Sequence, residues 1–600
     1  MEEKEYIRSL VLAVVVAVLA VVAIDWFVPS ERPEQVTTEQ VLQSEIERIS
    51  DADLTSPDGT SSSSIPAASV TPAATLATAP DKILSVAEAL EEGDRVQIKN
   101  SYISGSLRLK GARIDNVSLL KYRETLNPDS PNIVLFAPAG TAHPRYAEFG
   151  WISSEKVVLP DSSSVWKADK NTLTEGSPLV LTWDNGQGLQ FTRTIFLDNK
   201  YMFTISEKVK NTTENPVRLV PYGMIRQQGQ RSEDERKSYV SYTGPIAVMD
   251  NTLRDIGYDD LMESGKENYT SSDGGWIGFT EKYWLSALIF NQYAKDVKGN
   301  FVYSNINDKE VFQTDFMLQP VTLAAGAETE TISHLFVGAK DINTLDAYGE
   351  KYHISYFDKA IDFGWYYFLT KPFLYILNFL YSILGNMGLA ILLFALLLRL
   401  LVFPIANKSY VSMQKMKVLQ PKVKVLQERY KNDRQRLSME MTALYKKEGV
   451  NPASGCLPAM IQIPIFFSLY KVLYISIEMR QAPFYGWIHD LSAPDPSSVF
   501  TLCGLIDWPI PQLLNIGIWP LIMGITMFIQ FKMNPAPADK TQEHLFMFMP
   551  LVFTFMLAQF ASGLVIYWAW SNILAIIQQR IIIHGVNKKL KAHTKMKDIE

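Results

Sequence analysis

The run from Gly385 to Pro404, GNMGLAILLFALLLRLLVFP, constrains this chain more than any other segment, because it is apolar except for one full charge, Arg399. About 20 residues at about 1.5 Å each just span a hydrocarbon core of roughly 30 Å, so the run predicts a membrane helix. Arg399 lies about 7 Å inside the helix end. A buried guanidinium is costly without water or a partner. Arg399 therefore either extends to the headgroups or faces a hydrated pocket inside a helix bundle.

The segment from Pro404 to Gly455 is strongly basic. It holds eleven Lys and Arg against four acids, so the positive-inside rule predicts that it is cytoplasmic. Apolar residues in it recur every three or four positions, which predicts two antiparallel helices joined along a narrow seam: Met416, Leu419, Val423, Leu426 and Tyr430, then Leu437, Met441 and Leu444. A solvated hairpin that only fixes the membrane topology is the alternative.

The composition suits a chain that is half soluble domain and half membrane bundle, since 47% of its residues are hydrophobic and 12% aromatic. The net charge of -6 is uneven, with most acids in the N-terminal half. No long polybasic tract with interleaved aromatics favours nucleic-acid binding. Cys456 and Cys503, the only cysteines, have no metal-ligand pattern near them. The sequence therefore predicts no metal site, and no disulfide in the N-terminal half.

The N-terminus carries a second apolar run, Ser9 to Val28, which is long enough to span a membrane. No small-x-small cleavage site precedes the polar region, so an uncleaved signal anchor is expected rather than a signal peptide. The segment 30–81 is rich in Ser, Thr, Ala, Pro and acids, and its few large apolar residues predict a disordered tether.

From residue 82 to 341 the hydrophobic period changes to two. Apolar residues alternate with polar ones on both sides of a turn at 198–200: Leu189, Phe191 and Ile195, then Tyr201, Phe203 and Ile205. Asn185-Gly186 is another hairpin signal. About 260 residues of this kind predict one large antiparallel β-sandwich.

The segment 342–384 connects this sandwich to the membrane part. Phe357, Ile361, Trp365 and Phe368 recur on one helical face, which predicts an amphipathic helix in the membrane interface. A helix that caps the sandwich is the alternative. Both predictions hold if the stretch from Leu345 to His353 packs on the sandwich before the chain reaches the membrane.

Further apolar runs predict four more spans, at 456–475, 513–531, 545–560 and 564–583, with an external loop at 478–512. A lysine-rich tail then leaves the C-terminus inside, so six spans place both termini in the cytoplasm. The predicted organisation is 1–29 signal-anchor span, 30–81 linker, 82–341 sandwich, 342–384 connecting and interfacial helices, 385–404 second span, 405–455 cytoplasmic hairpin, 456–583 four further spans with loops, and 584–600 basic tail.

Four ordered motifs in the C-terminal 200 residues resemble the YidC/Oxa/Alb family of membrane-protein insertases: RLLVFPIANKSYVSMQKMKVLQPK (399–422), NPASGCLPAMIQIPIF (451–466), RQAPFYGWIHDLSAPDP (480–496) and SGLVIYWAWSNILAIIQQ (562–579). The resemblance implies a five-helix insertase core in the inner membrane of a Gram-negative bacterium. It also implies a periplasmic β-supersandwich similar to galactose mutarotases. Cooperation with the Sec translocon and its accessory proteins follows from it as well. The segment 497–511 looks like an insertion relative to short family members.

Nothing in the helices favours covalent catalysis, since no Walker loop, HExxH or Ser or Cys nucleophile with its base is found. Mutarotase chemistry needs an acid and a base, and the sandwich offers only His143 and His334. No cofactor and no small-molecule substrate are expected. The membrane helices instead carry one cation and scattered neutral polar groups, predicted to line a hydrated substrate groove: Arg399, Gln462, Thr526, Gln559, Ser571 and Asn572. Individually, such polar residues more often join helices.

The resemblance to the insertase family then implies how a nascent membrane protein is inserted. The basic hairpin residues would capture it: Lys415, Lys417, Lys422, Lys424, Arg429, Arg434 and Arg436. The basic tail would face the ribosome. An acidic external segment of the substrate would enter the groove near Arg399, while its apolar segment slides along a lipid-facing track: Phe466, Phe467, Met549 and Phe553.

Two other functional classes are alternatives for a chain of this kind. A solute transporter or channel would show inverted repeats and paired ionisable groups, and neither is visible. A periplasmic sugar-binding protein with a membrane anchor would need only one span. A chaperone role in helix packing is compatible with insertion.

Overall fold

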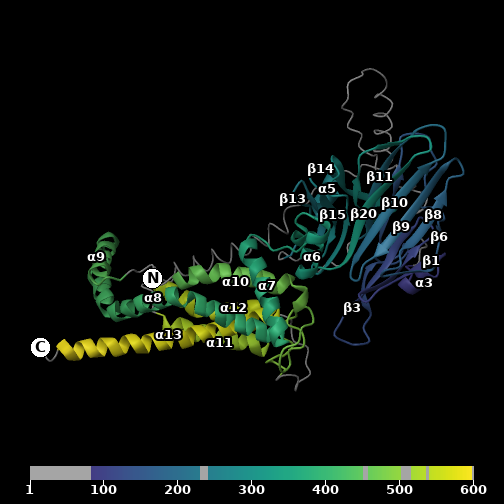
Figure 1. Cartoon of the computed structure of the whole chain (residues 1–600). Helices are drawn as coiled ribbons and strands as arrows, with labels where there is room; N and C mark the ends of the chain where they lie inside the picture. Colours follow the sequence, from purple (N-terminus) through teal and green to yellow (C-terminus); the bar gives the residue numbers. More distant parts are fainter. Residues whose placement is uncertain (1–82, 230–240, 451–456, 502–514, 535–539, 598–600) are drawn as a thin grey trace, which may run out of the picture. The chain divides into compact units, whose positions relative to one another are not determined.

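We describe a computed structural model that covers residues 83–229, 241–450, 457–501, 515–534 and 540–597 (Figure 1). The chain divides into two compact units, one ending at Asp362 and the other beginning at Phe363. The predicted signal anchor at 1–29, the linker at 30–81 and both cysteines lie outside the described residues.

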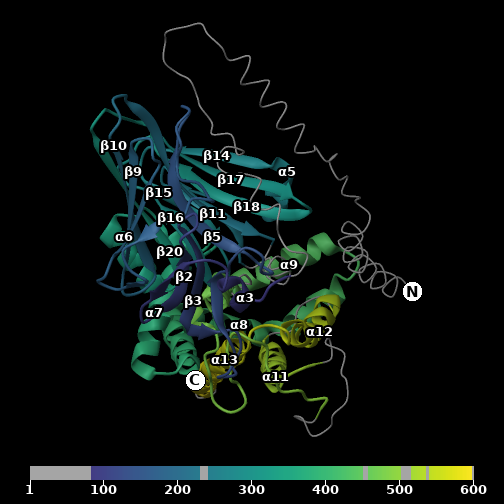
Figure 2. The same cartoon turned by 90° about the vertical axis from the view of Figure 1, so that its right-hand side faces the viewer.

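The first unit is a β-sandwich of two mainly antiparallel sheets, as the period-two pattern predicted (Figure 2). The larger sheet runs in the order β14 (Lys266–Ser271), β17 (Val297–Ile306), β18 (Lys309–Met317), β11 (Val217–Gln228), β5 (Arg145–Ile152), β3 (Arg113–Arg123), β2 (Ile103–Arg108), β1 (Arg95–Lys99) and β7 (Thr172–Thr174), with β4 (Asn132–Phe136) on β3 and β19 (Val321–Leu323) on β11. The other sheet runs in the order β13 (Thr252–Asp255), β12 (Gly244–Met249), β15 (Gly275–Thr280), β16 (Trp284–Ile289), β20 (Glu328–Ala339), β10 (Met202–Asn211), β9 (Leu189–Leu197), β8 (Leu179–Asp184) and β6 (Lys167–Ala168).

The predicted turns set the register of the second sheet. Gly186 has a φ of 69°, and the Asn185 side chain accepts a hydrogen bond from the Leu189 backbone at 2.9 Å, so β8 and β9 form a hairpin. The turn at 198–200 pairs β9 with β10. The alternating apolar residues of these strands are buried, as expected for one face packed on the core.

The core of the sandwich is aromatic. Trp276, Phe136, Phe203, Phe279 and Phe312, which come from both sheets, are fully buried. Each such side chain removes about 150–250 Å² from water, so these residues supply much of the free energy that holds the sheets together.

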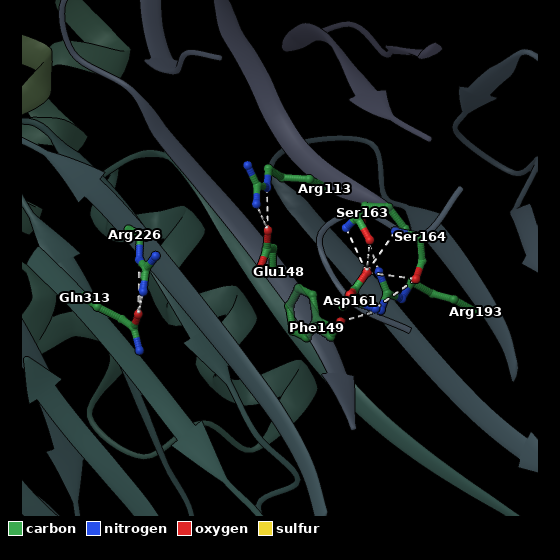
Figure 3. Close-up of polar contacts among 10 residues, drawn as sticks. Arg113, Glu148, Phe149, Asp161, Ser163, Ser164, Arg193, Arg226 and Gln313 are labelled. Atoms are coloured by element: carbon green, nitrogen blue, oxygen red, sulfur yellow. Dashed lines mark hydrogen bonds and ion pairs between the residues drawn. The ribbon is translucent and has the colours of Figure 1, made fainter. Parts of the chain in front are cut away.

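Two buried arginines of the sandwich form ion pairs with carboxylates, whereas a third, Arg226, donates hydrogen bonds to the Gln313 side chain (Figure 3). Arg193 on β9 forms an ion pair with Glu207 on β10 at 2.8 Å and donates a hydrogen bond to the backbone carbonyl of Ala112. It also donates to the Phe149 carbonyl in the opposite sheet (Figure 3). Arg113 is paired with Glu148 in the same way. Each ion pair lies within one sheet, and the hydrogen bonds from Arg193 to backbone carbonyls join the two sheets.

Helix α6 (Ile342–Tyr352) packs on the sandwich through Ile342, Leu345 and Tyr348, which confirms the capping alternative for this stretch. Two shorter helices, α3 (Val86–Leu90) and α5 (Tyr258–Ser264), complete the unit.

The continuous helix expected through Phe357, Ile361, Trp365 and Phe368 is wrong. Residues 357–360 form a short 3₁₀ helix, η2, and the next helix begins only at Tyr367. Phe357 and Ile361 are buried in the sandwich, whereas Trp365 is 98% exposed, so the apolar spacing spans two units with different surroundings.

The second unit is helical. Its elements are α7 (Tyr367–Leu384), α8 (Met387–Arg429), α9 (Arg434–Lys447), α10 (Leu457–Ile475), the 3₁₀ turn η4 (Ile477–Met479), α11 (Ile518–Met533), α12 (Lys540–Leu557) and α13 (Ser562–Lys597). Helix α13 packs against α8, α10 and α11, while α12 packs on α11 (Figure 1). A Cβ at Gly524 on α11 would lie 2.0 Å from the Thr554 hydroxyl oxygen on α12, so glycine permits this close approach.

Helix α8 continues through Pro404 and Pro421, so the predicted second span and the first arm of the basic hairpin form one 43-residue helix. The seam residues Leu419 and Val423 are buried. Within the described residues, α7 and α8 are long and apolar enough to cross a membrane, and α10, α11 and α12 contain shorter apolar stretches. One face of α7 is strongly exposed, with Phe368 at 69% and Phe379 at 64%, which suits contact with lipid.

Candidate functional site

Arg399 lies in the N-terminal third of α8, half-buried, and its side chain reaches across to α13. Its Nη2 donates to the Ser571 backbone carbonyl at 2.6 Å and to the Ser571 hydroxyl at 3.2 Å. Both acceptors are neutral, and among the described residues no carboxylate pairs with Arg399. Hydrogen bonds therefore solvate its positive charge, but no opposite charge neutralises it.

A cavity of about 30 Å³ adjoins this guanidinium. Its walls come from three helices: Ala395, Leu398, Arg399, Val402, Ile405 and Ala406 of α8, Ile461, Gln462 and Ile465 of α10, and Tyr567 and Ser571 of α13. Since one water needs about 10–15 Å³ of such volume, the cavity holds about two waters. A half-buried cation that faces a small cavity with polar groups in its walls fits the hydrated-pocket alternative better than extension of the side chain to the headgroups.

Gln462 connects two walls of the cavity. Its Nε2 donates to the Tyr567 hydroxyl at 3.1 Å and so joins α10 to α13. Gln462, Arg399 and Ser571 are thus three predicted groove residues that the fold brings around one space.

The other three predicted groove residues lie elsewhere. Asn572 donates to the Thr526 hydroxyl at 3.3 Å, both side chains are buried, and they join α13 to α11. Gln559 is exposed in the turn between α12 and α13. None of these three residues lines the cavity.

Two of the four predicted slide residues lie against one aromatic ring, that of Trp568. The Phe466 ring on α10 lies 4.4 Å from Trp568 on α13, and Phe553 on α12 lies 5.6 Å from the same ring. Phe467 is 49% exposed and Met549 is half-buried. The apolar track therefore runs over α10 and α12, with Trp568 between them.

The predicted capture residues of the hairpin are spread over α8 and α9. The following side chains are exposed: Lys415, Lys417, Lys422, Lys424, Arg429 and Arg436. The side chain of Arg434 lies outside the described residues. Lys422 pairs with Glu448 at 2.8 Å across the hairpin, and the other exposed cations leave a positive surface.

Sequence reasoning missed Tyr567 and Trp568. A signal for both was present, because each lies four residues before a residue that was selected, Ser571 and Asn572, and residues four apart share a helix face. Within the described residues, no cluster of three His, Cys, Asp or Glu side chains is arranged to hold a metal.

Comparison with known families assigns both units. Residues 95–376 match the YidC periplasmic domain, and residues 379–589 match the 60Kd inner membrane protein family. The two matches meet close to the boundary between the sandwich and the helices.

Known relatives match over most of the chain. Membrane protein insertase YidC of Methylorubrum extorquens (strain PA1) is 48% identical over 84% of this chain and 83% of that protein. The protein of the same name from Methylobacterium radiotolerans is 44% identical over 97% of this chain and 96% of that protein. A crystal structure of active YidC insertase, with its first transmembrane domain resolved, aligns at 15% identity and a TM-score of 0.34, covering 81% of this chain and 92% of that one.

Proposed function

The chain belongs to the YidC family of membrane protein insertases, and we propose that it carries out insertion through the cavity beside Arg399. It is an inner-membrane protein with a periplasmic domain, and its substrates are membrane proteins. A solute transporter or channel is not favoured, because the curated relatives are insertases over nearly the whole length.

The observation that carries the proposal is the way Arg399 is solvated. Its guanidinium is held by neutral oxygens next to a cavity with room for water. Moving a carboxylate toward the middle of a bilayer costs several kcal/mol, and a fixed positive charge at that depth lowers the cost. An acidic external segment of a substrate is therefore drawn to the cavity, where it replaces water on the guanidinium.

The apolar segment of the substrate follows the track formed by Phe466, Phe467, Met549 and Phe553. These side chains lie on α10 and α12, beside the helix that carries the cavity-lining Tyr567 and Ser571. Transfer of the segment into lipid releases about 25 cal/mol per Å² of apolar area, which drives insertion without a nucleotide.

The proposed topology has six spans with both termini in the cytoplasm and the sandwich in the periplasm. The exposed cations of the hairpin support the cytoplasmic assignment, since positive residues are retained on that side. We further propose that this hairpin and the basic tail capture nascent chains at the ribosome. The protein then acts alone or with the Sec translocon and its accessory proteins.

The test replaces the native protein with Arg399→Ala, Arg399→Lys or Arg399→Glu and measures insertion of a single-span substrate with an acidic external tail. Lys preserves the charge and should retain most activity, whereas Ala should lose about tenfold and Glu more. A substrate with a basic tail should restore the Glu variant. Lys408→Glu is the matched control, because Lys408 is exposed on the same helix and does not line the cavity. Normal insertion by all Arg399 variants would refute the electrostatic cavity.

A further inference from the structure

The N-terminal end of the Arg399 helix is covered by a short loop that follows η4. Asn386 caps α8 by accepting a hydrogen bond from the Leu389 backbone at 3.0 Å. The same side chain donates to the Pro483 carbonyl at 3.3 Å. The end of α8 is thereby tied to the loop at residues 481–486.

The Phe484 ring fills the space above this helix end. A Cβ added to Gly388 would lie 2.0 Å from Phe484 Cδ2, so only a glycine at position 388 admits the ring in this position. On its other side the ring faces Trp519 of α11, with centroids 6.4 Å apart. Phe484 therefore closes the gap between α8 and α11.

Below Phe484, the face of α8 is packed down to the cavity. Met387, Ala390, Ile391 and Phe394 are all buried. Gly388 and Arg399 are eleven residues apart, or about 16 Å along the helix. A segment that leaves the cavity toward this end of α8 has to separate packed side chains, and it meets Phe484 last.

The loop has two parts that hydrogen bonds connect, since the Leu491 backbone donates to the Ala482 carbonyl at 2.9 Å and the Phe484 backbone donates to the Ile488 carbonyl at 2.9 Å. Leu491 and Ile488 are fully buried. Asp495 accepts hydrogen bonds from Trp487 Nε1 at 3.0 Å and from the Trp519 backbone at 2.9 Å, which fixes the start of α11.

The part that carries Phe484 lies between two residues with left-handed backbone angles, Gln481 at φ 57° and Gly486 at φ 75°. The Gln481 conformation is unfavourable for a side-chain-bearing residue and is held by a hydrogen bond from its backbone to Asp490 at 3.1 Å. Such positions are suited to act as hinges, because a change at each one moves the segment between them.

We propose that Phe484 is the gate of the insertion route, a residue that closes the outer end of the groove against Gly388. The gate opens by rotation of residues 481–486, which breaks the hydrogen bonds from Leu491 to Ala482 and from Phe484 to Ile488, while residues 487–495 stay in place. The external segment of the substrate displaces the Phe484 ring and passes the end of α8. The ring then returns to its position against Gly388. This inference rests on the proposed function, since it assumes that the segment passes from the cavity along α8.

The test is a reversible lock in the full-length chain. In a background with Cys456→Ser and Cys503→Ser, the pair Gly388→Cys and Phe484→Cys is introduced. A Cβ at position 388 would lie 2.8 Å from the Phe484 Cγ, which brings the two cysteine Cβ atoms within disulfide range. Oxidation should reduce insertion of the acidic-tailed substrate by about tenfold, and reductant should restore it. Each single-cysteine variant serves as a control and should not respond to oxidant.

A photocrosslinker at position 402, in the cavity wall, separates the two proposals. If the gate is correct, the oxidised protein still crosslinks the substrate at 402 and fails to complete insertion. Full insertion by the oxidised protein overturns the gate, whatever the crosslink shows. Loss of the crosslink in both redox states overturns the cavity route, and the gate with it.

A second variant set tests the ring without a crosslink. Phe484→Ala should raise insertion of a substrate with a longer external tail, relative to one with a short tail, by about threefold, because the closure is smaller. Phe484→Leu keeps most of the bulk and should keep the wild-type ratio. His489→Ala is the control, since His489 is exposed in the same loop and does not line Gly388. An unchanged ratio in Phe484→Ala contradicts the gate.

Discussion

Arg193 in the sandwich and Arg399 in the helical unit are held in opposite ways. Arg193 is buried and has a carboxylate partner, Glu207, and two backbone carbonyls, of which Figure 3 shows that of Phe149. Arg399 is half-buried and donates its hydrogen bonds to the neutral oxygens of Ser571. The charge of Arg193 is neutralised by Glu207, whereas the charge of Arg399 can act on a substrate segment that enters the cavity.

The difference follows from what each unit has to do. A sandwich core has no water to solvate an ion, so an unpaired guanidinium would destabilise the fold. Burial alone raises the pKa of Glu207, and Arg193 opposes that shift. In the helical unit the cavity supplies room for water beside the Arg399 guanidinium. A carboxylate partner beside a buried arginine stabilises the fold. An arginine without such a partner can instead bind an acidic substrate segment electrostatically.

The largest effect is expected from Arg193→Met in the sandwich. Glu207 would be left buried without its partner, which costs about 3–5 kcal/mol of unfolding free energy. The cost should be greatest at high pH, where Glu207 has to stay ionised, and should shrink at low pH as it takes up a proton. Urea unfolding of residues 83–362 measures it. The double variant Arg193→Met with Glu207→Leu should recover most of the loss, and a single-variant loss below about 1 kcal/mol would show that the pair is not structural.

His334 shows a third way of burying a titratable group, which is to leave it uncharged. Burial, followed by the charge of Lys351, lowers its pKa to about 4. The folded state then binds fewer protons than the unfolded state, so stability is complete above about pH 6.5 and falls toward pH 4, by up to about 3 kcal/mol. His334→Gln should flatten this part of the urea-unfolding profile of the sandwich. His353→Asn, at an exposed position, should leave it intact.

Arg399→Met should give a smaller change in stability, about 1 kcal/mol or less, because no buried carboxylate loses its partner. Its insertion activity should nevertheless fall, unlike that of a sandwich variant of equal stability. Thermal unfolding in detergent and insertion into proteoliposomes measure the two quantities on one preparation. A loss of stability as large as that of Arg193→Met would mean that Arg399 is structural too.

The smallest effect is expected from Thr526→Val. Thr526 and Asn572 contact each other away from the cavity, and a single polar contact between membrane helices is worth about 0.6 kcal/mol. Insertion should stay at the wild-type level while the thermal midpoint falls slightly. A tenfold loss of insertion would instead place this pair on the substrate route.

Much of the fold was predictable from local patterns. The alternation around residues 189–205 predicted two paired strands because a strand with one buried face repeats every two residues. The apolar runs predicted the helices of the second unit because their composition and length carry the signal. The connection near Phe357 was predicted incorrectly, since a helical spacing also arises by chance where two units with separate cores adjoin.

The site was predictable only in part. Arg399 stood out because a charge inside an apolar run is unusual at any position. Thr526, Asn572 and Gln559 were selected by the same polarity argument, although polarity does not say which way a side chain faces.

The sequence by itself determined the two-unit organisation, the helices and strands, and the one charge that a membrane helix has to accommodate. Each of these depends on residues that are close together in the chain. Only the tertiary structure decided that Ser571 and Gln462 surround Arg399, that Trp568 lies between Phe466 and Phe553, and that Phe484 rests on Gly388. These contacts join residues from about 60 to 170 positions apart, except for that between Phe553 and Trp568 on neighbouring helices. The packing of the helices, and of the loop that carries Phe484, brings them together.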